Sequence, residues 1–100
     1  MPFGLTDDDI EQAQQVFLSF SDIATVTLFG SRAMGNYKRG SDIDLALKGD
    51  ITTSLVTQVS AKLNEETSLP YFFDVIDYHT ITNAELRDHI DQYGQVFYTR

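Results

Sequence analysis

Residues 28–47, LFGSRAMGNYKRGSDIDLAL, carry the arrangement that decides the fold. An apolar strand-forming segment runs into a Gly-Ser turn at Gly30 and Ser31, and a short loop then leads to a second apolar segment that contains Asp42 and Asp44. Strand interiors disfavour aspartate, and residues two apart in a strand point to the same side. The two carboxylates therefore project together, which indicates a functional role for them and not a packing role.

The segments around this stretch predict a small mixed sheet. β-branched and aromatic residues predict strands at 24–29, 42–47 and 71–78, with a short edge strand at 96–98. Apolar spacing and capping residues predict three helices. The first begins at Thr6 and buries Ile10, Ala13, Phe17 and Phe20, and the second covers 55–63. The third begins with a Thr82–Glu85 capping box and has Leu86, Ile90 and Tyr93 facing inward. A single helical turn is expected at 32–34. This order predicts an α/β (α+β) fold with helices packed against the sheet.

Composition and charge limit the function classes. One hundred residues, 42% of them hydrophobic, predict a single globular domain over 1–100. A formal net charge of −8 argues against direct nucleic-acid binding. The absence of cysteine excludes disulfides, zinc-thiolate sites and cysteine nucleophiles. Since the sequence has neither a signal peptide nor an apolar run of transmembrane length, we expect a soluble cytoplasmic protein without membrane contact.

A third acid completes a candidate metal site. Asp42 and Asp44 would raise each other's pKa unless a cation lies between them. If the predicted strand at 71–78 lies beside the one at 42–47, Asp74 reaches the same place. Three carboxylates around two Mg²⁺ ions are the arrangement used for in-line displacement at phosphorus. Asp42, Asp44 and Asp74 are therefore the candidate metal ligands and catalytic residues, with Asp74 as the candidate proton acceptor.

The Gly-Ser turn supplies a candidate phosphate site. Gly30 permits close approach of a ligand, and the amides that follow it, together with the Ser31 hydroxyl, can donate to phosphate oxygens. Arg32 has two alternatives of equal weight: it adds a positive charge for phosphate, or it braces the turn.

These motifs together resemble a known family. Phe29-Gly30-Ser31, ten intervening residues and Asp42-Ile43-Asp44-Leu45 are similar to the signature of the polymerase-beta-like nucleotidyltransferase superfamily. The fuller form, GSRAMG…SDIDLAL, resembles its smallest members, the minimal nucleotidyltransferase (MNT) proteins. Asp74, in FFDVID, falls where that family keeps its third carboxylate. The resemblance implies a two-metal Mg²⁺ site and ATP as the nucleotide substrate. Ser41, before the acid pair, would hold the loop or contact phosphate.

The family also implies a partner. MNT proteins are typically paired with helical HEPN ribonuclease toxins, and as antitoxins they transfer AMP from ATP to a tyrosine of the toxin. Two alternatives stay open: an antitoxin that blocks its partner by occlusion alone, and nucleotidyl transfer to a small molecule or to RNA. Whether Lys38 and Arg39 contact the triphosphate is also open. We expect a surface or capping role for Asp77, and exposed positions for His79 and His89.

Overall fold

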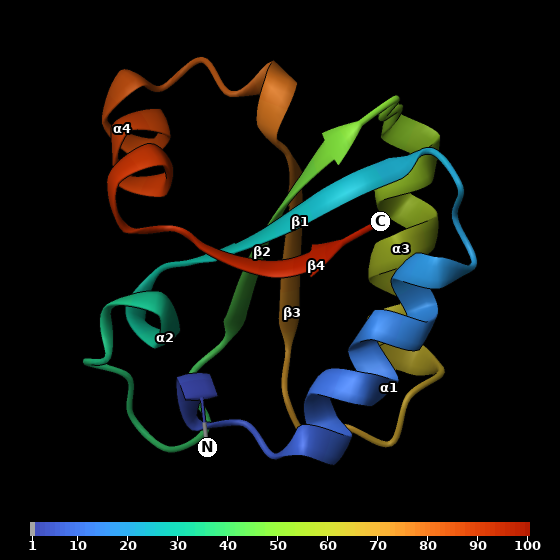
Figure 1. Ribbon diagram of the computed structural model, residues 1–100, viewed down its shortest axis with the longest axis vertical. Coiled ribbons are helices and arrows are strands. Elements are labelled where there is room, and N and C mark those ends of the chain that lie inside the picture. The colour runs from blue at the N-terminus through green and yellow to red at the C-terminus, as the bar shows by residue number, and fades with distance from the viewer. Residues whose placement is uncertain (1) are drawn as a thin grey trace.

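A four-stranded mixed sheet forms the centre of the computed structural model, which describes residues 2–100 (Figure 1). Its strands are β1 (Ile23–Phe29), β2 (Ile43–Gly49), β3 (Phe73–Asp77) and β4 (Gln95–Thr99). The order across the sheet is β3-β2-β1-β4. β2 runs parallel to β3, while β1 is antiparallel to both of its neighbours. The predicted mixed sheet is confirmed, and the predicted third strand does lie beside the second.

The helices begin where short polar side chains satisfy their first amides. The structure contains α1 (Asp7–Leu18), α2 (Ser31–Met34), α3 (Thr53–Glu65), α4 (Ala84–Tyr93) and two 3₁₀ turns, η1 (Pro2–Gly4) and η2 (Tyr78–Thr80). The Thr6 hydroxyl accepts a hydrogen bond from Asp9 N, and the Asp9 carboxylate accepts one from Thr6 N, each at 3.0 Å. No helix within residues 2–100 has both the length and the apolar character needed to cross a membrane.

The predicted start of the last helix is wrong by one residue. The Asn83 side chain, and not that of Thr82, caps α4, because its oxygen accepts from Leu86 N at 3.0 Å. Both residue types cap helices well, so composition alone cannot choose between adjacent candidates. Tyr93 was also predicted to face inward, but 42% of it is exposed at the end of α4.

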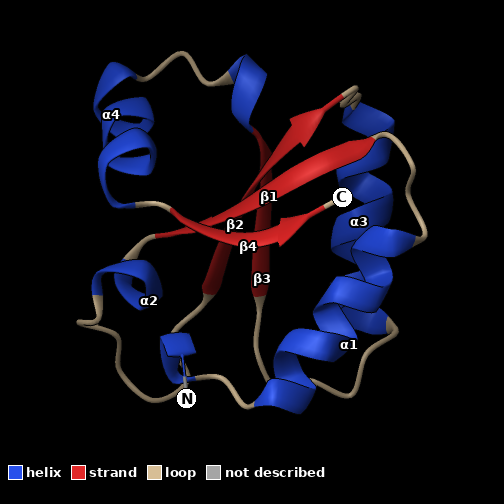
Figure 2. Ribbon diagram, viewed as in Figure 1, coloured by secondary structure: helices blue, strands red, loops and turns tan. Residues whose placement is uncertain are grey.

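The two faces of the sheet bury different side chains. One face packs against α1 and α3, and its core includes Phe17, Leu45, Val59 and Phe73. The opposite face carries a smaller cluster beneath α4, made of Phe29, Ala46, Ile81 and Ile90. Figure 2 shows α1 and α3 on one side of the strands and α4 on the other. In β2, Leu45 and Ala46 therefore face opposite layers, so Asp44 lies on the α4 side.

A side chain from α3 covers the outer edge of β3. Because β3 is the last strand in the order, its outward amides and carbonyls have no neighbouring strand. Asn64 donates through Nδ2 to Phe73 O at 3.0 Å and accepts through Oδ1 from Phe73 N at 2.8 Å. This carboxamide thus pairs with the strand as a backbone peptide would, which blunts an edge that could pair with another chain.

We expect Asn64→Ala to lower the free energy of unfolding by about 2 kcal/mol, because it removes the two hydrogen bonds to Phe73, worth roughly 1 kcal/mol each. A third, longer bond to Ser60 Oγ, within α3, is also lost. Urea denaturation measures the change. Gln58→Ala is the matched control, since Gln58 lies on the exposed side of α3 and its amide contacts Ser54 of the same helix. Equal stabilities of the two variants would show that the Asn64 carboxamide does not support β3.

Candidate active site

The three predicted acids come together where β2 and β3 begin. Asp44 and Asp74 are register partners in the parallel pair, so their Cα atoms lie about one strand spacing apart, roughly 4.8 Å. Asp42 directly precedes β2, which starts at Ile43, one residue later than predicted. Asp42 and Asp74 are exposed and Asp44 is half-buried. The acids therefore occupy one end of the sheet, with Asp44 as the innermost of the three.

Negative charge at Asp44 is destabilised by its surroundings. Burial, followed by the neighbouring carboxylates of Asp74 and Asp42, raises the pKa of Asp44 from 3.8 to about 6, while the nearby His89 acts in the opposite direction. Desolvation and like charge both disfavour the ionised form. A cation bound among these acids would stabilise the ionised form of Asp44 and lower its pKa.

Three carboxylates at the beginning of two adjacent strands are a donor set that suits a hard divalent cation such as Mg²⁺. Burial of Asp44 and the neighbouring carboxylates both disfavour its ionised form, and a bound cation would favour that form. Among residues 2–100, no three acidic or histidine side chains lie close enough together to form a preformed metal site. The acids thus share one region of the surface without converging on one point.

The Gly-Ser turn lies directly against Asp44. β1 ends at Phe29, which is the register partner of Asp44, and the turn follows at once. Gly30 has φ 77° and ψ −157°, a conformation open essentially to glycine alone. A methyl group added to Gly30 would collide with Oδ2 of Asp44. The missing side chain of Gly30 therefore leaves room for the carboxylate.

The amides that could reach a phosphate belong to the residues after Gly30. Gly30 N–H itself donates to Nε2 of His89 at 3.0 Å. Ser31 begins α2, and the N–H groups of a first helical turn have no acceptor within the helix. Ser31 is half-buried, and its amide and hydroxyl stay the predicted phosphate donors. Gly30 therefore contributes its backbone conformation and its lack of a side chain to the site, while its amide bonds to His89.

Arg32 braces the loop that follows α2. It is only 3% exposed and is the one buried charged side chain of residues 2–100. Its Nε donates to Ser41 O at 3.0 Å and its Nη1 to Phe3 O at 2.9 Å. Its guanidinium carbon lies 5.3 Å from the Tyr37 ring centroid and 4.9 Å from that of Tyr71. Of the two alternatives for Arg32, the bracing role has these contacts; a phosphate contact stays a prediction.

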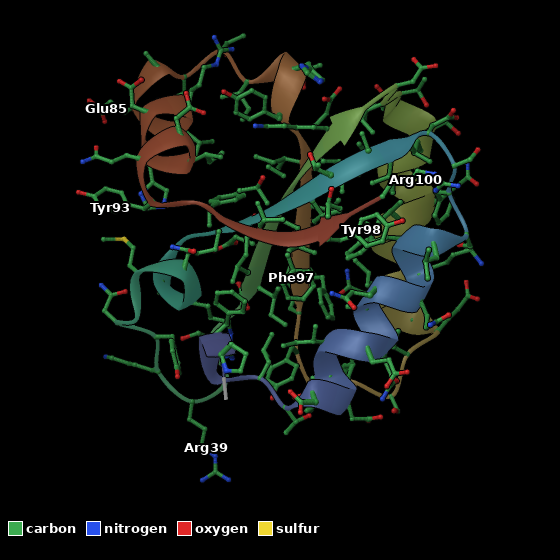
Figure 3. The ribbon with its side chains drawn as sticks, in the orientation of Figure 1. Arg39, Glu85, Tyr93, Phe97, Tyr98 and Arg100 are labelled. Atoms are coloured by element: carbon green, nitrogen blue, oxygen red, sulfur yellow. The ribbon has the colours of Figure 1, made fainter. Side chains whose placement is uncertain are left out.

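Ser41 also holds the loop closed. Its carbonyl accepts from Arg32, and its hydroxyl accepts from Lys38 N at 2.8 Å. Lys38 and Arg39 themselves are exposed, and Figure 3 shows Arg39 extending away from the body of the protein. The two residues line a cavity of about 270 Å³ beside Arg32 and the two tyrosine rings.

The expected exposure of His89 is wrong. His89 is half-buried and bonds to the Gly-Ser turn. The missed signal was helical periodicity: position 89 lies three residues after Leu86, which packs in the cluster between α4 and the sheet. His79 is exposed, as expected. The predicted capping role of Asp77 is confirmed, because its carboxylate accepts from His79 N at 2.9 Å.

The sequence matches a family model. The model described as polymerase beta, nucleotidyltransferase, matches residues 11–100. The chain belongs to this nucleotidyltransferase family. Members of the family typically use divalent metals and nucleoside triphosphates. No curated protein matches the sequence significantly.

Solved structures of MNT antitoxins have the same fold. A chain in a toxin-antitoxin crystal structure with AMP-PNP matches with a TM-score of 0.71 and 20% identity, over 96% of this chain and 75% of that chain. A chain in an MntA-HepT toxin-antitoxin structure matches with a TM-score of 0.70 and 15% identity, over 95% of this chain and 74% of that chain. A chain in the complex of a tri-AMPylated Shewanella oneidensis HEPN toxin with its MNT antitoxin matches with a TM-score of 0.70 and 15% identity. This match covers 96% of this chain and 74% of that chain. The predicted nucleotidyltransferase fold is confirmed.

Proposed function

We propose that the protein is an Mg²⁺-dependent nucleotidyltransferase of the MNT antitoxin type, which acts as a single catalytic domain. In this proposal it transfers AMP from ATP to a tyrosine hydroxyl of a cognate HEPN ribonuclease toxin. The observation that carries the proposal is the register of Asp44 opposite Asp74, with Gly30 packed on Asp44. Support for the partner and the donor comes from similar folds solved with AMP-PNP and with an AMPylated toxin.

Each residue has a defined task in this reaction. Asp42, Asp44 and Asp74 would hold magnesium, which when bound supplies charge neutralisation at phosphate oxygens. Ser31 binds phosphate oxygens of ATP through its amide and hydroxyl. The tyrosine oxygen attacks the α-phosphorus as its proton passes to the exposed Asp74 carboxylate. The bond from the α-phosphorus to the bridging oxygen breaks, and pyrophosphate leaves with that electron pair.

Intact-protein mass spectrometry tests the proposal. We expect a cognate HEPN toxin to gain the mass of AMP when incubated with the protein, ATP and Mg²⁺, and peptide mapping to place the group on tyrosine. Asp74→Asn should reduce the transfer rate about 10²-fold, the lower range for loss of a positioned proton acceptor. Asp50→Asn is the control, because Asp50 follows the other end of β2 and is exposed.

Two outcomes would contradict the proposal. An unmodified toxin after incubation with the wild-type protein would exclude the proposed transfer. If that toxin were nevertheless inhibited, the occlusion alternative would replace it.

A further inference from the structure

The imidazole of His89 joins α4 to the Gly-Ser turn. Its Nε2 accepts the Gly30 N–H at 3.0 Å. Two aromatic rings hold the imidazole: the Phe29 ring lies edge-on, with centroids 6.2 Å apart, and the Tyr93 ring is tilted, with centroids 5.5 Å apart. The half-buried His89 side chain is therefore fixed in orientation by contacts from β1 and from its own helix.

This hydrogen bond assigns a role to one ring nitrogen of His89. Nε2 is the acceptor, so this nitrogen carries no proton while the bond is made. The bond also gives an acceptor to the amide of Gly30, the residue directly before α2. With its N–H engaged by His89, Gly30 acts on the site through its backbone conformation.

The backbone conformation of Gly30 needs external support. A residue with φ 77° and ψ −157° lies in a sparsely populated region, and such conformations persist where surrounding contacts hold them. His89 holds Gly30 from the amide side, while Asp44 packs against the face of Gly30 that lacks a side chain. The turn is thus held between an imidazole and a carboxylate that come from different elements.

We propose that His89 is a positioning residue for nucleotidyl transfer, which holds the Gly30-Ser31 turn in place through the Gly30 amide so that Ser31 meets the phosphates of a nucleoside triphosphate. The role rests on the proposed function. His89 contacts neither the acceptor nor the reacting phosphorus in this role; it acts through Gly30.

Steady-state kinetics with three variants test this role. We expect His89→Ala to raise KM for ATP about tenfold, the effect of one lost hydrogen bond, with a smaller change in kcat. His89→Gln should recover most of the loss, because its carboxamide oxygen extends about as far as Nε2 and accepts from Gly30 N–H. His79→Ala is the matched control, since His79 is exposed and lies in η2, and it should leave KM unchanged.

Measurements that need no toxin give an independent readout. In ¹⁵N NMR spectra we expect Nε2 of wild-type His89 to be unprotonated, and the Gly30 amide to exchange more slowly in wild type and His89→Gln than in His89→Ala. Mg-ATP titrations followed by thermal shift should show weaker binding by the alanine variant. If His89→Ala does not fold, the wild-type tautomer and the glutamine variant still decide the matter.

Each result bears on one proposal. A protonated Nε2 in the wild type, or normal Mg-ATP binding by a folded His89→Ala, would overturn the positioning role. A glutamine variant as weak as the alanine variant would also overturn it. Absence of AMP transfer by the wild-type protein, with His89-dependent Mg-ATP binding intact, would instead overturn the proposed transfer to the toxin.

Discussion

Replacing Asp44 with asparagine is expected to slow the proposed AMP transfer strongly and to stabilise the metal-free protein. Loss of a ligand from the proposed magnesium site should reduce the rate about 10³-fold, because a bound metal supplies several kcal/mol of transition-state stabilisation. Asparagine also removes the charge that burial and neighbouring acids disfavour, as the pKa of about 6 records. That pKa corresponds to at most about 3 kcal/mol, which solvent screening at this half-exposed side chain reduces to about 1 kcal/mol.

The stability gain of Asp44→Asn should depend on pH. Between pH 3.8 and about 6 the folded protein retains a proton at Asp44 that the unfolded chain has released, so wild-type stability falls as the pH rises through this range. The advantage of asparagine is therefore full above about pH 6 and vanishes below about pH 4. Thermal melts in EDTA at pH 4 and pH 7.5 measure it, with an expected gain of about 5 °C at the higher pH.

Asp22→Asn separates this effect from a general loss of negative charge. Asp22 is exposed and directly precedes β1, at the end of the strand opposite to the Gly-Ser turn. We expect this variant to keep wild-type transfer and to show little pH-dependent gain. An equal gain in both variants would assign the stabilisation to the net charge of −8 instead of to the acid cluster.

Gly30→Ala should be the most damaging substitution that leaves every acid in place. The alanine methyl group would collide with Oδ2 of Asp44, and the backbone at φ 77° would be strained. Strain of this kind costs about 1–3 kcal/mol, which lowers the melting temperature by roughly 10 °C. Displacement of the Asp44 carboxylate by about 1 Å should reduce transfer about 10²-fold or more. Differential scanning fluorimetry and the mass-shift assay measure the two effects.

Gly35→Ala provides a matched control for Gly30→Ala. Gly35 also has a positive φ, 83°, but an added methyl group there would meet no atom of residues 2–100 within 4 Å. We expect a stability loss of about 1 kcal/mol from strain alone and wild-type transfer. If both glycine variants lost transfer equally, the collision with Asp44 would not be the cause.

The strands, and the side of the sheet on which Asp44 lies, could be predicted from the sequence because both depend on local periodicity. Alternation in 42–47 places Leu45 in the core and Asp44 on the opposite face, and the structure has this arrangement. The β-branched pattern of 71–78 predicted the strand that carries Asp74. The neighbour of that strand was left as a condition for Asp74 to reach the other acids, and the structure meets this condition by pairing β3 with β2, Asp44 opposite Asp74.

Contacts between distant segments could not be predicted in the same way. Arg32 donates to carbonyl groups of Phe3 and Ser41, and backbone carbonyls are present at every position, so no residue type marks them as partners. His89 meets Gly30 only because α4 packs across the end of β1. Such contacts depend on the angle between packed elements, which a one-dimensional pattern does not contain.

Arg32 and Tyr37 connect residues 3–4 to the loop that follows α2. Phe3 receives one hydrogen bond from the same guanidinium that holds Ser41, and a methyl group at Gly4 would collide with the Tyr37 ring. An affinity tag or fusion partner attached ahead of Phe3 would therefore extend from a segment that contacts the loop preceding Asp42. Recombinant protein intended for kinetic work is better extended beyond Arg100, where the final backbone amide pairs with Ala24 at the end of the sheet remote from the acids.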